Sequence, residues 1–564
     1  MQEENWCSAI PNYDQFSSVL ADFDQYSSGS LSALQPKLMD AIHRFCAISS
    51  RPNVLLVNAL DNSIYRTLIK EWLSDVATRR AEAMCYTEQT VLMSETISER
   101  ELFGCVHAIS EDGVTTSQTE YGLLHKAHGG YLVLSVTAIL ANPQAWPRLK
   151  SVLLGQPLHW QPSDSKAATT LPEPTPIDIK LVIVGDRALL GELDNLEPDL
   201  NSGMSLFGEF ELEFLLSDAL LPNYISFIKG LLKENNLPPL ADKDALEALL
   251  VAGAREYEDQ LRVPLCPIWH QNILAESAFE SKGNAITSQH IHGAMQARNY
   301  RESYLPLRAV EDILEGQVVI QCEGEQVGQV NGLTVIEVPG HPRPYGEPAR
   351  ISCVIHFGDG DISDVERKAE LGGNLHAKGM MIMQAFVSSS LNLNEPLPYS
   401  ASIVFEQSYC EVDGDSASLA ELCSLVSALS EQPINQQIAV TGAVDQFGRV
   451  QAVGGINEKV EGFFHICSHR GLTGKQGVIL PKTNLRNLVL ADDVVEAIKA
   501  KKFHIWSVES VDEAIPLLTG KAFRGESEKD TILNRIAQRI EEFEHHEHEN
   551  PNLLSKLKNW FVQN

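Results

Sequence analysis

A serine and a lysine, each at the expected start of a helix, are the residues of this chain whose types and spacing could do chemistry. Ser416 follows the acidic turn Val412-Asp413-Gly414-Asp415 and opens a predicted helix, residues 416–430, whose apolar residues recur at helical spacing. Lys459 lies 43 residues further on, early in a second predicted helix that follows a pair of glycines. Backbone amides at the start of the first helix would point toward whatever Ser416 attacks. The pair is therefore a candidate nucleophile and base.

The chemistry of such a pair depends on the charge of the lysine. A serine hydroxyl becomes a good nucleophile only when a base takes its proton, and lysine is a base only when it is neutral. Apolar neighbours, Ile456, Val460 and Phe463, and the positive end of its own helix would both lower the pKa of Lys459. Thr441, between the two helices, could orient the amine through its hydroxyl. Serine caps and solvated lysines are common, so spacing alone leaves a purely structural role open.

The first half of the chain has the strands of a nucleotide-binding α/β domain without its phosphate-binding residues. A buried strand is expected at 54–57, and the following residues, Asn58–Tyr65, contain no glycine and no lysine and add an acid, Asp61. A second strand, 130–134, ends in Ser135-Val136, where an ATPase would place Asp-Glu to hold magnesium. We therefore expect no cofactor, and ATP binding is disfavoured.

The chain of 564 residues is too long for one ordinary core, and we predict an α/β multidomain protein. Strands and helices alternate at first, a continuous helical pattern follows, and short strands with glycine turns begin near Val318. These changes predict five parts: an N-terminal helical segment at 1–50, an α/β domain at 51–223, a helical lid at 224–305, a second α/β domain at 306–518 and a C-terminal helical tail at 519–564.

Neither the histidines nor the cysteines of the sequence predict a metal site. The tail is expected to be a charged helix with an apolar stripe, Ile532, Ile536, Ile540 and Phe543, and the histidines at 545, 546 and 548 are interpreted as its solvated end. The ten cysteines include no Cys-x-x-Cys pair and no matching histidine spacing. Neither a zinc site nor a disulfide framework is expected, and a reducing cytoplasm fits best.

The charge of the chain narrows its partners. A formal net charge of -31 and a pI of about 4.9 disfavour nucleic acid and anionic membranes, because the mean field would repel both. The N-terminal residues Met1–Asn5 are neither basic nor apolar, and the longest apolar run, Tyr131–Ala141, is too short to span a bilayer. We expect a cytoplasmic protein with no membrane and no nucleic-acid partner.

Motifs around Ser416 and Lys459 resemble those of the Lon protease family, in particular its B-type and related branch. The matching residues are Glu411-Val412-Asp413-Gly414-Asp415-Ser416-Ala417-Ser418, Val440-Thr441-Gly442, Gly448 and Val453-Gly454-Gly455-Ile456-Asn457-Glu458-Lys459. Further matches lie upstream, at 328–333, 376–379, 101–104, 127–132 and 185–186. The resemblance therefore covers nearly the whole chain, and least of all the tail after about residue 520.

The resemblance implies a serine-type endopeptidase with an AAA-like domain, a helical lid and a Lon proteolytic domain. It implies that Ser416 is the nucleophile and Lys459 the general base. Thr441 falls on the position that supports the lysine, and Asp413 on the acid just before the serine; both are secondary site residues. The family also implies polypeptide substrates and a homo-oligomeric ring, a hexamer.

One departure from the family decides the predicted energy source. The ATP-driven members have a phosphate loop and an Asp-Glu pair, and this chain has neither at Asn58–Tyr65 nor at Ser135-Val136. We therefore predict a degenerate AAA+-like domain and hydrolysis of unfolded proteins or peptides without ATP hydrolysis. Two alternatives stay open: an ATP-dependent protease with unorthodox nucleotide contacts, and a catalytically silent ring scaffold or partner-binding adaptor.

Overall fold

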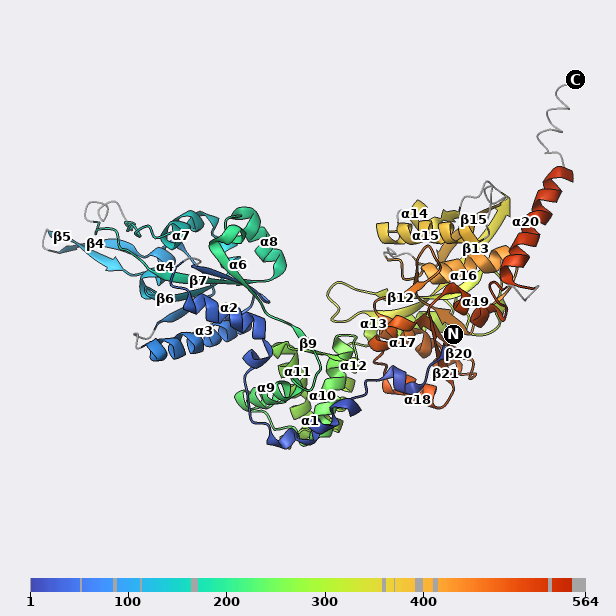
Figure 1. Cartoon of the computed structure of the whole chain (residues 1–564), viewed down its shortest axis with the longest axis horizontal. Helices are drawn as coiled ribbons and strands as arrows, with labels where there is room; N and C mark the ends of the chain where they lie inside the picture. Colours follow the sequence, from blue (N-terminus) through green and yellow to red (C-terminus); the bar gives the residue numbers. More distant parts are fainter. Residues whose placement is uncertain are drawn as a thin grey trace, which may run out of the picture. The chain divides into compact units, whose positions relative to one another are not determined.

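The helices and strands of the chain fall into two compact units (Figure 1). The computed structural model describes residues 2–50, 53–84, 89–111, 114–163, 171–357, 362–369, 371–390, 399–408, 414–525 and 530–549. The small unit comprises Ser27–Phe214 and Pro222–Gly230, and the large unit comprises Met1–Tyr26, Leu215–Leu221 and Leu231–Asn564. The predicted segment 1–50 is thus divided between the two units, and each unit is a mixture of helices and strands. The predicted α/β multidomain class is confirmed.

The small unit is a parallel sheet with helices on both faces. In spatial order its described strands are β3 (Val91–Ser94), β6 (Gly130–Ser135), β7 (Ile179–Gly185), β2 (Val54–Asn58) and β8 (Ser205–Glu209). Its helices are α2 (Pro36–Ala47), α3 (Ser63–Met84), α4 (Glu99–Phe103), α5 (Leu123–Lys126), α6 (Val136–Leu140), α7 (Trp146–Leu153) and α8 (Arg187–Leu196). α2 and α3 pack on one face, and α6 and α7 on the other (Figure 1). Strands covered on both faces read as continuous apolar runs, which is why β2, β6 and β7 were predictable.

A hairpin projects from this sheet. It is formed by β4 (Cys105–Glu111) and β5 (Val114–Glu120), which pair antiparallel between α4 and α5. In the sequence, the short strand β9 (Glu213–Leu215) follows β8. None of the helices in the described part of the chain is both long enough and apolar enough to cross a lipid bilayer.

The large unit is built on a mixed sheet of eight described strands. In spatial order they are β1 (Gln2–Glu3), β21 (Phe503–Val508), β20 (Gln476–Pro481), β17 (Ile438–Val440), β12 (Gln329–Ile336), β13 (Tyr345–Phe357), β15 (Tyr399–Glu406) and β14 (Ile362–Asp364). Two short pairs accompany it: β11 (Glu325–Gln326) with β16 (Ile434–Asn435), and β18 (Ala443–Val444) with β19 (Val450–Gln451). The helices of this part are α14 (Val365–Lys368), α15 (Asn374–Ser390), α16 (Ser418–Ser430), α17 (Ile456–Arg470), α18 (Asp492–Lys499) and α19 (Val511–Thr519).

This sheet separates two hydrophobic cores, and the helices α16 and α17 belong to different ones. Along β17, Val440 packs with α16, whereas the preceding residue, Ala439, packs with α17. The neighbouring strand β20 repeats the alternation, with Ile479 on the α16 side and Val478 on the α17 side. Successive side chains of a strand point to opposite faces, so the two helices cover opposite faces of the sheet.

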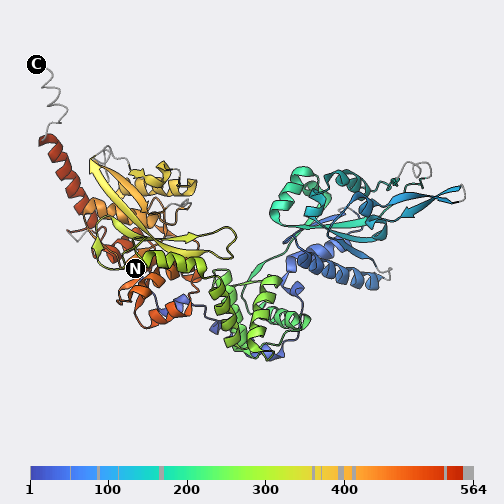
Figure 2. The ribbon, with the colours of Figure 1, turned by 180° about the vertical axis from the view of Figure 1, so that it is seen from behind.

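The predicted helical lid is confirmed as a group of helices: α9 (Leu221–Glu234), α10 (Lys243–Glu256), α11 (Pro267–Ser281), α12 (Ser288–Arg301) and α13 (Tyr304–Leu314). One short strand, β10 (Arg262–Pro264), interrupts them. Within the large unit, α10, α11 and α12 pack against one another and appear in green in Figure 2. Near the N-terminus, α1 (Ser17–Ala21) and short 3-10 turns precede this unit's main elements.

The C-terminal helix α20 (Ile532–Glu549) packs on α16 (Figure 1). Ile532, Ile536 and Ile540 are buried in the same core as α16, as the apolar stripe predicts. Arg539 Nη1 donates to the carbonyl oxygens of Ala428 and Leu429, at 2.6 and 3.0 Å, near the C-terminal end of α16. The side chains beyond residue 541 lie outside the described residues. The tail therefore covers the helix that follows Ser416.

This contact gives a first testable prediction. Ile536→Ala should lower the free energy of unfolding of the large unit by about 2–4 kcal/mol, because it removes a fully buried side chain between α20 and α16 and leaves a cavity. Urea unfolding followed by fluorescence measures the effect. Gln538→Ala, at an exposed position of the same helix, is the control and should leave the midpoint unchanged. Equal midpoints for both variants would show that α20 is not docked in solution.

Candidate active site

Ser416 lies in a turn immediately before α16. The sequence predicts that the helix opens at residue 416, but it begins at Ser418, with Ala417 as its N-cap. The reason is local: both the backbone nitrogen and the hydroxyl of Ser418 donate to the carbonyl oxygen of Asp415, at 3.1 and 2.8 Å, which closes a turn before the helical pattern starts. Ser416 is half-buried, whereas every residue of α16 is buried. The turn therefore places Ser416 directly before a buried helix.

The carbonyl group of Ser416 is hydrogen-bonded to the two residues that follow β17. Gly442 N–H donates to this carbonyl oxygen at 2.9 Å, and Thr441 Oγ1 donates to it at 3.3 Å. In return, Leu419 N–H donates to the carbonyl oxygen of Gly442 at 3.1 Å. Thr441 is fully buried, so its hydroxyl is held at this position. The structure thus brings Thr441 and Ser416 together through the serine's backbone; that Thr441 supports the lysine stays a prediction.

The amides around Ser416 differ in what they bind. The amides of Ser418 and Leu419, at the start of α16, are already used by the carbonyl oxygens of Asp415 and Gly442. Those of Ser416 and Ala417 donate to no other described residue. The amides at the observed helix start are therefore already engaged, and the two amides of the preceding turn, where the sequence predicted the helix to open, are the available donors for an oxyanion.

Lys459 lies in the first turn of α17, as predicted. The helix begins after Gly455, whose φ of 62° is left-handed and whose position would place any Cβ 2.5 Å from Val335 Cγ2, so only glycine fits. The neighbours Ile456 and Val460 are fully buried, and Lys459 itself is only 3% exposed. The sequence indicated this environment correctly: a glycine pair, a helix start and apolar neighbours.

Burial changes the acidity of Lys459. Removal of the amine from water lowers its pKa from the usual value to about 8, although the carboxyl groups of Glu258, Asp415 and Glu458 act in the opposite direction. The positive end of the α17 dipole also disfavours the charged form. Asp415 directly precedes Ser416, so one of the charges that act on Lys459 belongs to the serine turn. Asp413, predicted as a secondary site residue, lies outside the described residues.

An arginine from the lid holds the helix that carries Lys459. Arg255, in the last turn of α10, donates through Nη1 and Nη2 to the two carboxylate oxygens of Glu461, at 2.6 and 2.9 Å. Its Nη2 also donates to Glu458 Oε1 at 2.8 Å. Just beyond α10, Glu258 Oε2 accepts from the backbone N–H of Gly455 at 3.3 Å. The lid therefore fixes the first two turns of α17 on either side of Lys459.

Sequence reasoning missed Arg255 and Glu258. The sequence separation between Arg255 and Glu458 is 203 residues, and a charged residue near a helix end is usually solvated. No local signal distinguishes these two from other charges of the lid. Asp415 could have been chosen, because it stands next to Ser416 in the acidic turn.

The loop after β2, where the sequence lacks a phosphate loop, is closed by its own side chains. Asn62 Oδ1 accepts from the backbone nitrogens of Ile64 and Tyr65, at 3.0 and 3.3 Å, so the first amides of α3 are already capped. Asp61 Oδ2 accepts from the hydroxyls of Ser135 and Thr137, at 2.8 and 2.5 Å, at the end of β6. These are the positions where helix amides and a magnesium ligand bind phosphate in nucleotide sites.

A buried arginine completes this closure. The guanidinium of Arg66 pairs with Asp61 and with Glu95, and its side chain is only 6% exposed. The carboxylate of Asp61 thus lies where a phosphate would need a positive charge. The nearby guanidinium of Arg66 is paired with two carboxylates, those of Asp61 and Glu95. At this edge of the sheet the described contacts thus engage two amides of α3 and pair Arg66 with two carboxylates.

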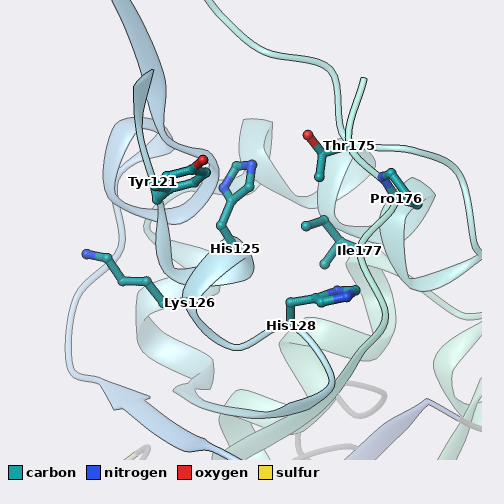
Figure 3. Close-up of a pocket in the computed structure, with 7 residues that line it drawn as sticks. All are labelled: Tyr121, His125, Lys126, His128, Thr175, Pro176 and Ile177. Atoms are coloured by element: carbon teal, nitrogen blue, oxygen red, sulfur yellow. The ribbon is translucent and has the colours of Figure 1, made fainter. Parts of the chain in front are cut away.

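A cavity of about 420 Å³ lies elsewhere in the small unit (Figure 3). It is lined by Tyr121, His125, Lys126, His128, Thr175, Pro176 and Ile177. The imidazole of His125 stacks on Trp160, with ring centroids 4.4 Å apart, and burial lowers its pKa. The lining is mostly apolar and lies at α5 rather than at the end of β2. It is therefore not the nucleotide position of the sheet, and it lies in a different unit from Ser416.

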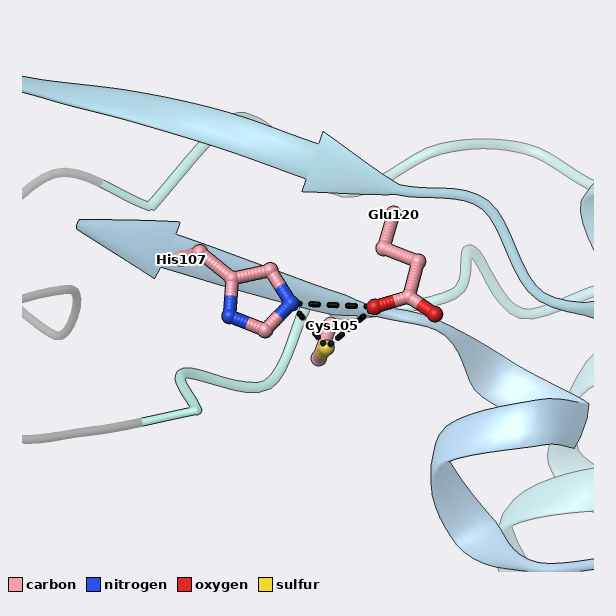
Figure 4. Close-up of side chains that lie close together, drawn as sticks. All are labelled: Cys105, His107 and Glu120. Carbon is pink, nitrogen blue, oxygen red and sulfur yellow. Dashed lines mark hydrogen bonds and ion pairs between the residues drawn. The ribbon is translucent and has the colours of Figure 1, made fainter. Parts of the chain in front are cut away.

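A cluster of possible metal ligands lies at the base of the hairpin (Figure 4). His107 Nε2 is 2.9 Å from Glu120 Oε2 and 3.2 Å from Cys105 Sγ. Arg100 Nη2 donates to the same carboxylate oxygen at 2.6 Å and lies 3.3 Å from His107 Nε2. Together His107 and this guanidinium hold the pKa of the Glu120 carboxyl at about 2. A cation already occupies the position that a metal would take, so these residues do not form a good metal site.

Two family models match the chain. The model described as "LonB-like, AAA domain" matches residues 87–211, in the small unit. The model described as "Lon protease (S16) C-terminal proteolytic domain" matches residues 403–519, in the large unit, and this range contains both Ser416 and Lys459. Each match therefore falls in the unit whose fold was described above.

Full-length relatives carry the same similarity across both units. A Lon protease homolog of Escherichia coli (strain K12) is 39% identical over 587 residues, which cover 99% of each protein. A Lon protease homolog of Haemophilus influenzae is 42% identical over 452 residues, 78% of this chain and 73% of that protein. An archaeal Lon protease of Thermococcus kodakarensis is 26% identical over 431 residues, 75% of this chain and 64% of the archaeal one.

The clamp on α17 gives a testable prediction. Arg255→Met should lower the free energy of unfolding of the large unit by about 3–5 kcal/mol, because it leaves the carboxylates of Glu458 and Glu461 partly buried without their cation. Chemical unfolding measures the loss. Arg308→Met is the matched control: Arg308 also pairs with two carboxylates, but on the exposed surface, where little change is expected. Equal losses for both variants would contradict the role of the clamp.

Proposed function

Because the chain belongs to the Lon protease family, we propose that it is a serine endopeptidase in which Ser416 and Lys459 form the catalytic dyad. The single observation that carries this proposal is the buried amine of Lys459. Its pKa is lowered to about 8, and it interacts with Asp415, the residue next to Ser416. A lysine in this state is partly neutral near physiological pH and can accept a proton.

The proposed reaction has two steps that use the same base. Neutral Lys459 takes the hydroxyl proton of Ser416 while the serine oxygen attacks the peptide carbonyl carbon. The amides of Ser416 and Ala417 donate to the oxyanion, and one such donor contributes about 2.7–4 kcal/mol. Protonated Lys459 then gives its proton to the leaving amine, which breaks the C–N bond. In the second step Lys459 takes a proton from water while the water oxygen attacks the acyl carbonyl carbon; the ester C–O bond then breaks, and Lys459 returns the proton to the leaving Ser416 oxygen.

We propose that proteolysis proceeds without ATP hydrolysis. The contacts of Asp61, Asn62 and Arg66 support this proposal, because they use the helix amides and the strand-end hydroxyls that a phosphate and its magnesium would need. Without a motor that pulls folded chains apart, the enzyme should act on unfolded proteins and peptides. We therefore also propose that the AAA-like small unit has a structural role and binds no nucleotide cofactor.

The proposed assembly and location follow from the family and from the charge of the chain. We propose a homo-oligomeric ring, a hexamer, in the cytoplasm, with polypeptide substrates as partners. The net charge of -31 supports the absence of a nucleic-acid partner, because phosphates would be repelled. Analytical ultracentrifugation tests the ring directly, since monomer at micromolar concentration would contradict it.

The dyad and the energy source can be tested in one assay. Hydrolysis of unfolded casein by the wild type should be equally fast with and without ATP, with Mg²⁺ present throughout. Ser416→Ala and Lys459→Ala should each reduce the rate by about 10³-fold or more, because each removes a group that acts in both steps. A serine-directed covalent probe should label the wild type and not Ser416→Ala.

Each other outcome contradicts a distinct part of the proposal. A requirement for hydrolysable ATP would favour the ATP-dependent alternative. Casein that stays intact, with no covalent labelling of Ser416, would favour a scaffold or adaptor. Ser424→Ala is a matched control, because Ser424 is a fully buried serine on α16, the helix that follows Ser416, and the rate of this variant should stay near that of the wild type.

The lowered pKa of Lys459 predicts how the rate depends on pH. Because only the neutral amine accepts the serine proton, kcat/KM for an uncharged peptide substrate should rise about tenfold per pH unit well below the pKa and level off above about 8. The profile should be recorded for the wild type, with unfolding midpoints measured at each pH as the control for stability. A rate that is independent of pH across this range would contradict Lys459 as the base.

A further inference from the structure

Three buried acidic residues and one buried histidine form a cluster that includes a residue of α16, the helix that follows Ser416. Its members are Asp364 at the end of β14, Glu366 on α14, His376 on α15 and Glu421 on α16. All four are buried, with exposed fractions of 7, 4, 1 and 1%. They come from four different elements of the large unit, and the proposed dyad uses none of them. Such a concentration of charge in an interior needs a compensating partner.

The backbone holds one oxygen of two of these carboxylates and turns the other inward. Asp364 Oδ1 accepts from the backbone nitrogens of Glu366 and Arg367, at 3.1 and 3.4 Å. Glu366 Oε1 accepts from the backbone nitrogen of Phe405 at 2.8 Å. Their other oxygens, Asp364 Oδ2 and Glu366 Oε2, are buried and have no hydrogen bond of good geometry from a described residue, although Asp364 Oδ2 lies within ion-pair distance of His376. Each carboxylate is thus fixed in place with one lone oxygen directed into the cluster.

The imidazole of His376 lies between two of the acids. Its Nε2 is 3.1 Å from Asp364 Oδ2, and its Nδ1 is 3.6 Å from Glu421 Oε1. Within the described residues, His376 Nε2 and Glu421 Oε1 also have no hydrogen bond of good geometry. One atom from each of Asp364, Glu366 and His376 lies within 4.8 Å of the others. Ligands about 2.0–2.2 Å from a common ion can lie at most about 4.4 Å apart, so small side-chain shifts would bring these atoms onto one ion.

We propose that Asp364, Glu366 and His376 bind a divalent transition-metal cation, Zn²⁺ or Mn²⁺. Two carboxylate oxygens and one imidazole nitrogen, without sulfur, suit these ions, whereas Ca²⁺ and Mg²⁺ prefer oxygen ligands alone. Glu421 then accepts from Nδ1–H of His376 and orients the ring, an arrangement that is common around metal-bound histidines. The two positive charges of the ion balance the two ligand carboxylates, which explains how this interior tolerates them.

The position of this site suggests what the ion does. One turn after His376 on α15, Gly379 lies so close to the serine turn that a Cβ there would be 3.3 Å from Asp415 Cβ. Glu421 lies on α16, five residues after Ser416. An ion between α14, α15 and α16 therefore fixes the two helices that contact the serine turn, independently of how the dyad reacts.

The exposed cluster of Cys105, His107 and Glu120 provides the contrast. There the guanidinium of Arg100 lies among the ligands, whereas none of the described positive side chains enters the buried cluster apart from His376 itself. No metal site was predicted from the sequence, because short spacings of cysteine and histidine were the pattern that would have indicated one. The proposed ligands Asp364 and Glu366 are two residues apart, but His376 follows on another helix.

Metal binding can be measured without reference to activity. In every protein used, the histidines at 545, 546 and 548 are replaced by asparagine and the affinity tag is removed. After treatment with a chelator, the wild type should bind one Zn²⁺ or Mn²⁺ per chain by isothermal titration calorimetry, and the ion should raise the unfolding midpoint. Asp364→Asn, Glu366→Gln and His376→Gln should each lose at least about tenfold in affinity, and Glu421→Gln about 10–100-fold.

The controls separate this site from others in the chain. His107→Gln removes the exposed cluster and should bind the ion as the wild type does. Mg²⁺ and Ca²⁺ should not raise the unfolding midpoint at concentrations where Zn²⁺ or Mn²⁺ saturates. The proposal is overturned if the wild type binds no ion in stoichiometric amount and its midpoint does not move, or if the three ligand variants keep the wild-type affinity. Ion binding and the midpoint shift of the wild type are measured without any variant, so a variant that fails to fold does not decide the result.

Discussion

The removal of one amine from water is the constraint on which the rest of the site depends. The proposed role of Lys459 as a base requires a pKa near physiological pH, whereas three carboxyl groups nearby would by themselves raise it. Burial outweighs them because Gly455 lets α17 start against Val335 and because Arg255 takes up the charge of the flanking glutamates. The lid thus holds the helix that carries Lys459 through the glutamates on either side of it.

The second constraint is where the two helices meet. α16 and α17 cover opposite faces of one sheet, so a serine and a lysine at their starts can approach only at the edge where the strands end. β17 ends at this edge, and its following residues Thr441 and Gly442 bind the carbonyl group of Ser416. The residues at the end of the short strand β17 therefore fix the position of the Ser416 turn relative to the sheet. The tail helix α20 adds rigidity from the other side of α16.

The small unit retains the sheet of a nucleotide-binding domain while its side chains satisfy one another. Asn62 caps α3, and Asp61 binds the hydroxyls at the end of β6 and pairs with Arg66. These contacts stabilise the loop, because the carboxylate of Asp61 and the amide oxygen of Asn62 both have partners. The same interactions remove the amides and the positive charge that a triphosphate would use.

Local patterns in the sequence determined the elements: the apolar runs at β2, β6 and β7, the helical lid, the stripe of α20 and the helix starts near Ser416 and Lys459. They did so because periodicity, glycine turns and buried runs act over a few residues. The sequence pattern placed the start of α16 two residues too early, because the turn at Ser418 depends on its hydrogen bonds to the carbonyl oxygen of Asp415. Only the tertiary structure decided the roles of Arg255 and Glu258 and the gathering of Asp364, Glu366 and His376. These side chains meet across different elements, and no short-range pattern records which charges the fold will bury together.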